Sequence, residues 1–186
     1  MSAALRPLTD DELDADVARY WRTIGEGLPG HRVPGLYRVM AHNPAIIEPF
    51  HRYARALFMD AGLDPVLRQL VILRTIWLER CGHAWQQHLL VSRDVGVAPA
   101  LIEAIGNWEH GEFDPVQRAA LRIVDLIVIE RGGRLLTDEE MGELSSGEVI
   151  VVELLAGLYI TICRLLNSAG LAAETPVDAW PAGPRP

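Results

Sequence analysis

The chain of 186 residues is predicted to fold as an all-α protein. Helix-start signals recur along it, among them three places where Asn or Asp precedes Pro, and no stretch shows the polar and apolar alternation of a half-buried strand. The length suits one domain with a core of its own. Apolar residues make up 49% and charged residues 23% of the chain, which excludes a disordered or fibrous protein.

The start and stop signals divide the chain into helical segments. Thr9 and Glu12 have the spacing of a capping box and open the first helix, and the Gly- and Pro-rich run that follows it predicts a loop. Two helices, or one helix broken at Cys81-Gly82, are expected between residues 64 and 95. The predicted segments are 9–26, 43–62, 64–80, 81–95, 99–108, one starting at 114, one starting at a second capping box (Thr137 and Glu140), and 147–169.

The most apolar stretch, residues 149–166, is predicted to be a core helix. Glu153 and Arg164 leave only a short uncharged run between them, whereas a membrane-spanning helix needs about 20 apolar residues. The N-terminus lacks the apolar segment of a signal peptide. Two cysteines, Cys81 and Cys163, are too few for a disulfide framework, so a cytoplasmic location is expected.

Charge and composition exclude several functional classes. A net charge of −8 argues against nucleic acid and anionic membranes as partners. All 17 basic residues are Arg, so lysine Schiff-base chemistry, covalent pyridoxal phosphate and the phosphate-binding loop with its Lys are excluded. The histidines outside residues 80–88 show no metal-ligand spacing, and we expect neither a metal nor a cofactor.

The run RCGHAWQQH, residues 80–88, holds the candidate chemistry. On a helix Cys81, Ala84, Trp85 and His88 share one face, while His83 is turned roughly 200° from Cys81. Cys81 and His88 are two turns apart, roughly 10 Å along a regular helix, so they cannot hydrogen-bond directly. The residue one turn before His88 is Ala84, which offers no group to deprotonate.

Three separated motifs, LRQLVILRT…CGHAWQQH, DPVQRAALRIVDL and GLYITICRLLNSAGL, resemble the carboxymuconolactone decarboxylase and alkylhydroperoxidase-D superfamily. The resemblance covers about Val33 to Leu171. It implies an antiparallel helical bundle that assembles as a homotrimer or homohexamer. The chain is accordingly divided into an N-terminal helix and loop (1–32), the superfamily domain (33–171) and a Pro-rich C-terminal arm (172–186).

The resemblance also shows which functional groups are missing. The peroxidase branch uses E…C-x-x-C-x-x-x-H, and those positions hold Gln69, Cys81, Ala84 and His88. Without the second Cys, ordinary peroxidase chemistry is disfavoured. Cys163 could replace it only if the two Cα atoms came within roughly 7 Å, which we do not expect. In the C-x-Y-E-W-x-x-H run of the decarboxylase branch, the Tyr and Glu positions hold His83 and Ala84.

The preferred hypothesis is a cofactor-independent acid/base enzyme that decarboxylates, isomerises or cyclises a small organic acid, lactone or enol. His88 would move the proton and Gln69 would orient it. Tyr159 and Asn167, at positions implied by the resemblance, would hydrogen-bond the substrate. Trp85 would line a pocket enlarged at Ala84.

Each candidate also has a structural interpretation. His88 could be a satisfied buried histidine, Cys81 an inert buried thiol, and Trp85 simple packing. His83 would bind substrate only if a rotated helix brought it to a neighbouring subunit's pocket, and it is otherwise a surface or interface residue. Arg74 is expected to pair with an acid such as Asp125, or else to anchor a substrate carboxylate. Two other functions stay open: a thiol peroxidase or redox protein that uses Cys81, and a non-catalytic ligand-binding oligomer.

Overall fold

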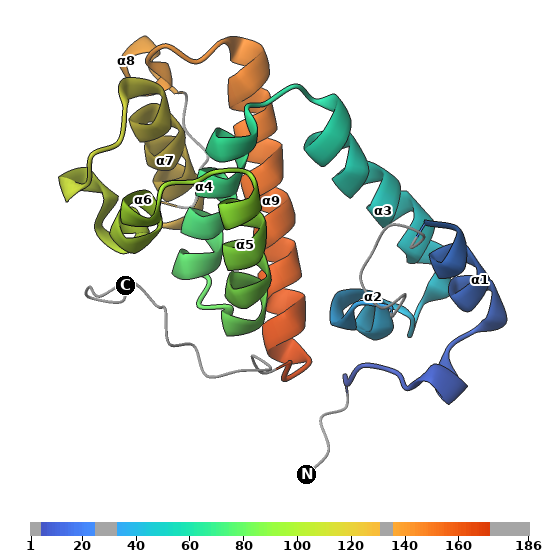
Figure 1. Ribbon diagram of the computed structural model, residues 1–186. Coiled ribbons are helices and arrows are strands. Elements are labelled where there is room, and N and C mark those ends of the chain that lie inside the picture. Colours follow the sequence, from blue (N-terminus) through green and yellow to red (C-terminus); the bar gives the residue numbers. More distant parts are fainter. Residues whose placement is uncertain (1–4, 25–32, 131–135, 172–186) are drawn as a thin grey trace.

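The computed structural model describes residues 5–24, 33–130 and 136–171, which are helical with no strand among them and confirm the all-α prediction (Figure 1). In chain order the elements are the 3₁₀ turn η1 (Asp10–Glu12), α1 (Ala15–Ile24), α2 (Gly35–Met40), the 3₁₀ turn η3 (Pro44–Ile46), α3 (Ile47–Arg55), the π-helical turn η4 (Ala56–Asp60), α4 (Pro65–Leu78), α5 (Gly82–Asp94), α6 (Pro99–Ala104), the 3₁₀ segment η5 (Ile105–His110), α7 (Pro115–Val128), α8 (Asp138–Met141) and α9 (Ser146–Ser168).

Several predicted helix starts are confirmed by their cap bonds. The Asp64 carboxylate accepts the Leu67 N–H at 2.9 Å at the start of α4, and Asp114 with Gln117 forms a capping box before α7. The capping box of Thr137 opens α8 as predicted. Each of these side chains satisfies backbone N–H groups that a helix start leaves without partners.

Other boundaries differ from the prediction. The Thr9 capping box begins only the short turn η1. Helix α1 begins later, after Asp14, whose carboxylate accepts the Asp16 N–H at 2.7 Å. Asn43 makes no side-chain cap bond. Helix α9 begins at Ser146, one residue before the predicted start at Gly147, and Ser145 caps it together with Glu148. The six-residue helix α2 was not predicted.

Helix α4 lies at the centre of the molecule. Eleven of its fourteen residues are buried, and it packs against α5, α7 and α9. Figure 1 shows α9 running the length of this bundle. An all-round apolar helix of this kind must be enclosed by others, so α4 is the natural support for a site inside the bundle.

The turn between α4 and α5 shows whether residues 64–95 form two helices or one helix with a break. Arg80 has a left-handed backbone with φ of 55°, and the Cys81 N–H bonds to the Ile76 carbonyl at 3.2 Å. This geometry ends α4 in the way that a left-handed residue commonly ends a helix. Two separate helices result, and Cys81 is the N-cap residue of α5.

The N-terminal elements form a second, smaller cluster beside the bundle. Its buried members come from α1, α2, α3 and the turn between the last two: Val17, Met40, Ala41 and Ile47. Figure 1 shows this cluster to one side of α9. The cluster contains residues from before and after the domain boundary predicted near residue 33. That boundary stays a prediction. The predicted C-terminal arm, 172–186, lies outside the described residues.

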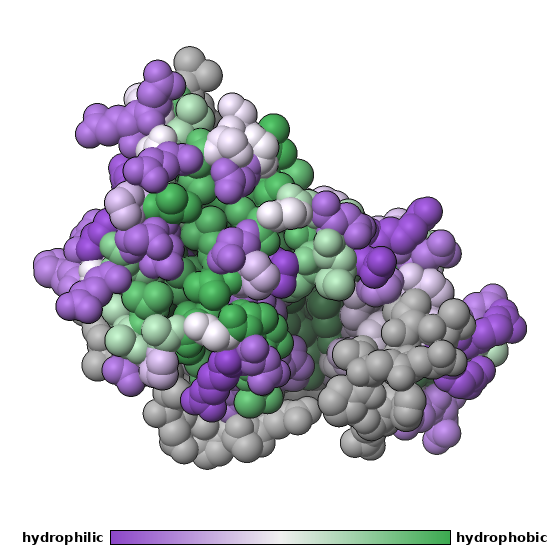
Figure 2. Space-filling model, turned by 45° about the horizontal axis from the view of Figure 1, so that its top comes forward, coloured by the Kyte–Doolittle hydropathy of each residue, from purple (hydrophilic) through white to green (hydrophobic). Residues whose placement is uncertain are grey.

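Helix α9 is long and apolar enough to cross a membrane by length and composition, but it packs on α4 and α7. Nine of its residues are buried in the bundle, which fits the predicted core helix. Some of its apolar side chains, Ile150 and Leu154, are exposed. On the face drawn in Figure 2, apolar side chains form a broad area bordered by polar ones.

Candidate functional site

A chain of three polar side chains crosses the bundle from α4 through α5 to α9. His88 Nδ1 lies 2.9 Å from Oε1 of Gln69, and His88 Nε2 lies 2.8 Å from the Tyr159 hydroxyl. The imidazole and phenol rings meet edge to face, with centroids 5.0 Å apart. Three of the residues singled out from the sequence therefore converge.

The hydrogen bonds define the protonation state of His88. An amide oxygen can only accept, so Nδ1 carries the hydrogen and donates it to Gln69. Nε2 is then the unprotonated nitrogen and accepts the hydroxyl proton of Tyr159. The Ser92 hydroxyl approaches the same oxygen of Gln69 at 3.5 Å, while the Gln69 amide nitrogen is buried without a partner.

Burial keeps both titrating members of this chain neutral. It lowers the pKa of His88 to about 4, and it raises the pKa of Tyr159 well above its usual range. Gln69 is fully buried, whereas His88 is only partly buried. The imidazole is thus a neutral base at pH 7, with both of its ring nitrogens engaged in hydrogen bonds.

Cys81 lies on another part of the same helix and contacts the second cysteine. Its sulfur is hydrogen-bonded to the Cys163 thiol of α9 and to the backbone N–H groups of His83 and Ala84. The two thiols are therefore in contact, although we did not expect the fold to bring the two cysteines together. The Cys163 hydrogen bond, followed by those N–H groups, lowers the pKa of Cys81, while the same bond and burial raise the pKa of Cys163.

The cysteine contact could not be found from spacing, because it depends on how α9 crosses the first turn of α5. Both thiols are free and fully buried. The lowered pKa of Cys81 agrees with its expected place at a helix start, where N–H groups and the helix dipole favour a thiolate. The pair provides one thiolate-forming sulfur and one sulfur that keeps its proton.

Three further residues of the 80–88 segment, His83, Ala84 and Trp85, are buried. Trp85 is fully buried and Ala84 is 2% exposed, so the pocket expected beside Ala84 is not open. His83 is only 6% exposed and lies beside Gln87, which corrects the expectation of a surface or interface residue. Its imidazole fills space next to the backbone of Gly35.

Arg74 forms a closed ion pair with Asp125, as one of the two interpretations predicted. Its Nε and Nη2 donate to the two carboxylate oxygens at 2.7 and 3.0 Å, and its Nη1 donates to the carbonyls of Ile105 and Gly106. Trp108 donates its indole N–H to the same carboxylate at 2.9 Å. This bonding favours the structural role of Arg74 over that of a substrate anchor.

Asn167 also lies apart from the polar chain of His88. Its side-chain amide donates to the Glu79 carbonyl at 3.0 Å, at the end of α4. Next to it, Arg164 makes two 3.0 Å bonds to the Glu79 carboxylate. Both residues hold the end of α9 against the turn between α4 and α5.

Two residues that the sequence analysis did not select adjoin Tyr159. Phe58, from the π-helical turn η4, packs on Tyr159 with ring centroids 6.2 Å apart. The guanidinium of Arg68 lies over the Phe58 ring at 5.5 Å from its centroid. π-Helical turns are frequent at functional sites, but no sequence pattern predicts where they occur. The sequence therefore offered no signal for these two residues.

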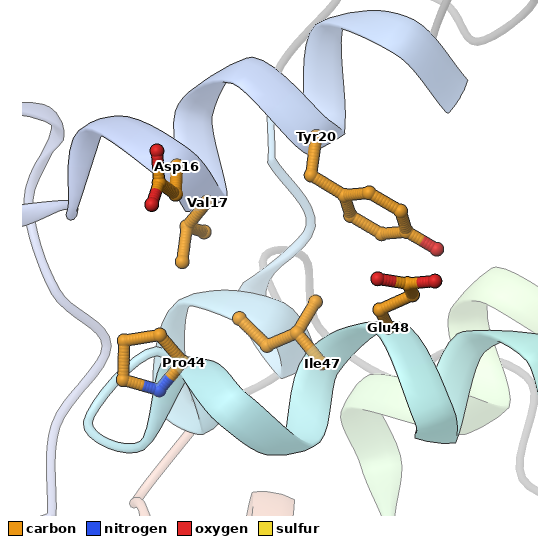
Figure 3. A pocket seen from close by; sticks show the side chains of 6 residues that line it. All are labelled: Asp16, Val17, Tyr20, Pro44, Ile47 and Glu48. Atoms are coloured by element: carbon orange, nitrogen blue, oxygen red, sulfur yellow. The ribbon is translucent and has the colours of Figure 1, made fainter.

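A separate shallow pocket lies between α1 and the start of α3, as Figure 3 shows. Its volume is about 140 Å³, small for a ligand site, which usually measures hundreds of Å³. The residues that line it are Asp16, Val17, Tyr20, Pro44, Ile47 and Glu48. In the described ranges, no group of three or more His, Cys, Asp or Glu side chains could hold a metal ion.

A comparison with known protein families supports the family resemblance inferred from the sequence motifs. The model of the carboxymuconolactone decarboxylase family matches residues 44–126, which contain α4 and the 80–88 segment. No curated protein matches the chain in sequence.

Two crystal structures share the fold. An uncharacterized peroxidase-related protein from Ralstonia eutropha JMP134, described as an alkylhydroperoxidase AhpD core, has a TM-score of 0.76 over 94% of each chain, at 17% identity. A protein of unknown function from Agrobacterium tumefaciens, described as a candidate antioxidant-defence protein AhpD, has a TM-score of 0.66 at 17% identity, over 72% of this chain and 94% of its own. The predicted bundle of this type is confirmed.

Proposed function

Because the chain belongs to the carboxymuconolactone decarboxylase and alkylhydroperoxidase-D-like superfamily, we propose that it is an acid/base enzyme that needs no cofactor. The substrate class is a small organic acid, lactone or enol. The observation that supports this most directly is the hydrogen-bonded chain from Gln69 through His88 to Tyr159. It holds a neutral imidazole in one tautomer beside a hydroxyl group, as proton transfer requires.

In the proposed step Tyr159 relays the proton. Its oxygen takes a proton from a carbon or oxygen of the substrate while its own proton moves 2.8 Å to Nε2 of His88. The imidazolium that forms keeps its bond to the Gln69 oxygen, and the proton returns by the same route to the product. Gln69 is a positioning residue here, because its amide oxygen fixes the ring.

The low pKa of His88 limits this chemistry. With a pKa of about 4, protonating His88 at pH 7 costs about 4 kcal/mol. A substrate that brings negative charge to the site would lower this cost, because an anion favours the imidazolium. The site is therefore better suited to anionic substrates than to neutral ones.

The test is turnover of carboxymuconolactone and a panel of β-keto acids by His88→Gln. We expect turnover to fall at least 100-fold, in the range that a general base contributes. His51→Gln is the matched control, because His51 forms a similar 2.9 Å pair with Tyr20 outside the site. Unchanged turnover in His88→Gln would remove His88 from the mechanism. Binding without conversion by the wild type would favour the ligand-binding oligomer.

A second candidate function is thiol oxidation, which the contact between Cys81 and Cys163 favours. The Cys81 thiolate would attack a peroxide, forming an S–O bond as the O–O bond breaks, and the leaving oxygen would take a proton. The Cys163 thiol would then attack the sulfenic acid, giving a disulfide and water. We rank this second because both thiols have no exposed surface, whereas Tyr159 is 4% exposed and its partner His88 is a partly exposed residue.

Peroxide treatment followed by mass spectrometry distinguishes the second candidate. Oxidation should remove two hydrogens from the wild type, and Cys163→Ser should instead accumulate sulfenic acid at Cys81. Cys81→Ser is the control, and it should form neither the disulfide nor the sulfenic acid. Thiols that stay inert in the wild type exclude this function.

We also propose that the chain acts as a homotrimer or homohexamer. The exposed apolar side chains of Met59, Ile150 and Leu154 support an association surface. Light scattering on the purified protein measures its mass directly. A monomer at micromolar concentration would contradict this proposal.

A further inference from the structure

The partly or fully buried arginines differ in how their charge is balanced. Among the described residues there are five, and three pair with a carboxylate: Arg38 with Asp10, Arg74 with Asp125, and Arg122 with Glu130. The fourth, Arg118, donates through all three nitrogens to backbone carbonyls. The fifth is Arg68.

Arg68 has neither arrangement. Its Nη1 donates to the Phe58 carbonyl at 2.5 Å, but its Nε is buried without a partner. No carboxylate of the described residues forms an ion pair with it. A cation removed from water without a counter-ion costs free energy, which an anion bound there would recover. The side chain as a whole is only partly buried, so an anion would meet the outer part of the guanidinium, whereas Nε itself is enclosed.

The position of Arg68 places its unpaired charge beside the proton relay. Phe58 packs against the Arg68 guanidinium and the Tyr159 ring, at 5.5 and 6.2 Å from its ring centroid. The positive charge of Arg68 is close enough to Tyr159 to oppose the effect of burial on its pKa. Arg68 also precedes Gln69 on α4, and the Gln69 amide nitrogen is a second buried donor without a partner. The two unused donors therefore come from adjacent residues beside the relay.

We propose that Arg68 binds the carboxylate of the substrate, so that the substrate is an organic carboxylate whose reacting group lies at Tyr159. The apolar part of the substrate would contact Phe58. This assigns to Arg68 the anchoring role that the sequence analysis considered for Arg74, which Asp125 already occupies. The placement of the reacting group at Tyr159 rests on the proposed function, whereas the binding of a carboxylate at Arg68 does not.

Calorimetric titration with benzoate and with its neutral analogue benzamide tests the binding. The wild type should bind benzoate at least tenfold more tightly than benzamide, because a guanidinium forms charge-assisted bonds with a carboxylate. Arg68→Gln should remove that preference. Arg68→Lys should keep part of it, because it keeps the charge and loses the planar fork. Arg118→Gln is the matched control, since it removes another partly buried arginine that has no carboxylate partner, and it should bind benzoate as the wild type does.

A second readout separates binding from a general effect on folding. Benzoate should shift the ring signals of His88 in the nuclear magnetic resonance spectrum of the wild type and leave them unchanged in Arg68→Gln. If Arg68→Gln unfolds, the Arg68→Lys titration decides. Equal affinity of the wild type for benzoate and benzamide, or wild-type affinity for benzoate in Arg68→Gln, would overturn the proposal.

The His88→Gln variant separates this proposal from the proposed function. It should bind benzoate within threefold of the wild type, because Arg68 is unchanged, while turnover is lost. Retained turnover in His88→Gln with normal benzoate binding would reject the relay and leave the Arg68 site standing. Normal turnover of a carboxylate by Arg68→Gln, with unchanged KM, would reject Arg68 and leave the relay.

Discussion

Helix α4 contributes to two polar networks that differ in how completely they are satisfied. In the first, Arg74 pairs with Asp125, and Trp108 donates to the same carboxylate, so opposite charges meet and nearly every donor has an acceptor. In the second, Gln69 holds His88, yet the Gln69 amide nitrogen has no partner. A closed network stabilises the fold, while an incomplete one leaves donors free for a ligand. We therefore expect the Arg74 network to stabilise the fold and the His88 network to take part in the chemistry.

Breaking the closed network should have the largest effect on stability. Asp125→Ala leaves the Arg74 guanidinium buried without its carboxylate, which costs about 3 to 5 kcal/mol of unfolding free energy. Denaturant unfolding of the full chain measures this cost. Glu79→Gln is the control, because its pair with Arg164 is largely exposed on the arginine side and should contribute less than about 1 kcal/mol. A loss below 1 kcal/mol in Asp125→Ala would contradict the assignment.

The incomplete network should appear instead as a pH dependence of stability. Because burial lowers the pKa of His88 to about 4, the unfolded chain binds a proton below its usual pKa of 6.5 while the folded chain does not. Stability contributed by this group is therefore full above pH 6.5 and falls toward pH 4, by at most about 3 kcal/mol. Denaturant unfolding at several pH values should show this decline in the wild type. A His88→Gln variant with the same slope as the wild type would exclude His88 as its source.

Removing one hydroxyl from the incomplete network should have a smaller effect. Tyr159→Phe deletes the donor to Nε2 of His88, at a cost of about 1 kcal/mol. Because that bond stabilises the neutral ring, its loss should raise the pKa of His88 toward the usual value. A magnetic resonance titration of the His88 ring measures the change. An unchanged pKa would mean that the hydroxyl does not hold the ring in solution.

The smallest effect is expected for Ser92→Ala. The Ser92 hydroxyl is 3.5 Å from the Gln69 oxygen, at the limit of a hydrogen bond, so its loss should cost no more than about 0.5 kcal/mol. Unfolding free energy and the His88 pKa should both stay near wild-type values. A large change in either would mean that Gln69 depends on Ser92 as much as on His88.

Much of the fold could be predicted from local signals. Asp64 and Asp114 both cap helices, because an Asx before Pro satisfies the first N–H groups and presets the backbone. The pairing of Arg74 with an acid such as Asp125 followed from the cost of burying a lone charge. The extent of a capped element was harder to predict. Thr9 caps only a 3₁₀ turn, because a capping box indicates where a helix starts and not how far it continues.

The candidate site was less predictable, since it depends on contacts between helices. Tyr159 was selected through the family resemblance, and the structure places it beside His88. The contact between Cys81 and Cys163 depends on the way α9 crosses α5, which no spacing rule contains. Arg68 was missed because a missing partner leaves no pattern in a sequence. Periodicity predicts which face of a helix is buried and cannot tell which buried groups lack a partner.

The π-helical turn at residues 56–60 makes this part of the chain sensitive to length. A single-residue deletion there would restore ordinary helical pitch and rotate the preceding or following side chains by roughly 100°. Phe58 would then leave both Arg68 and Tyr159, although the bundle around α4 would stay intact. If Arg68 and Tyr159 hold the substrate as proposed, the length of this short turn sets which molecules fit between them, while the architecture of the bundle does not depend on it.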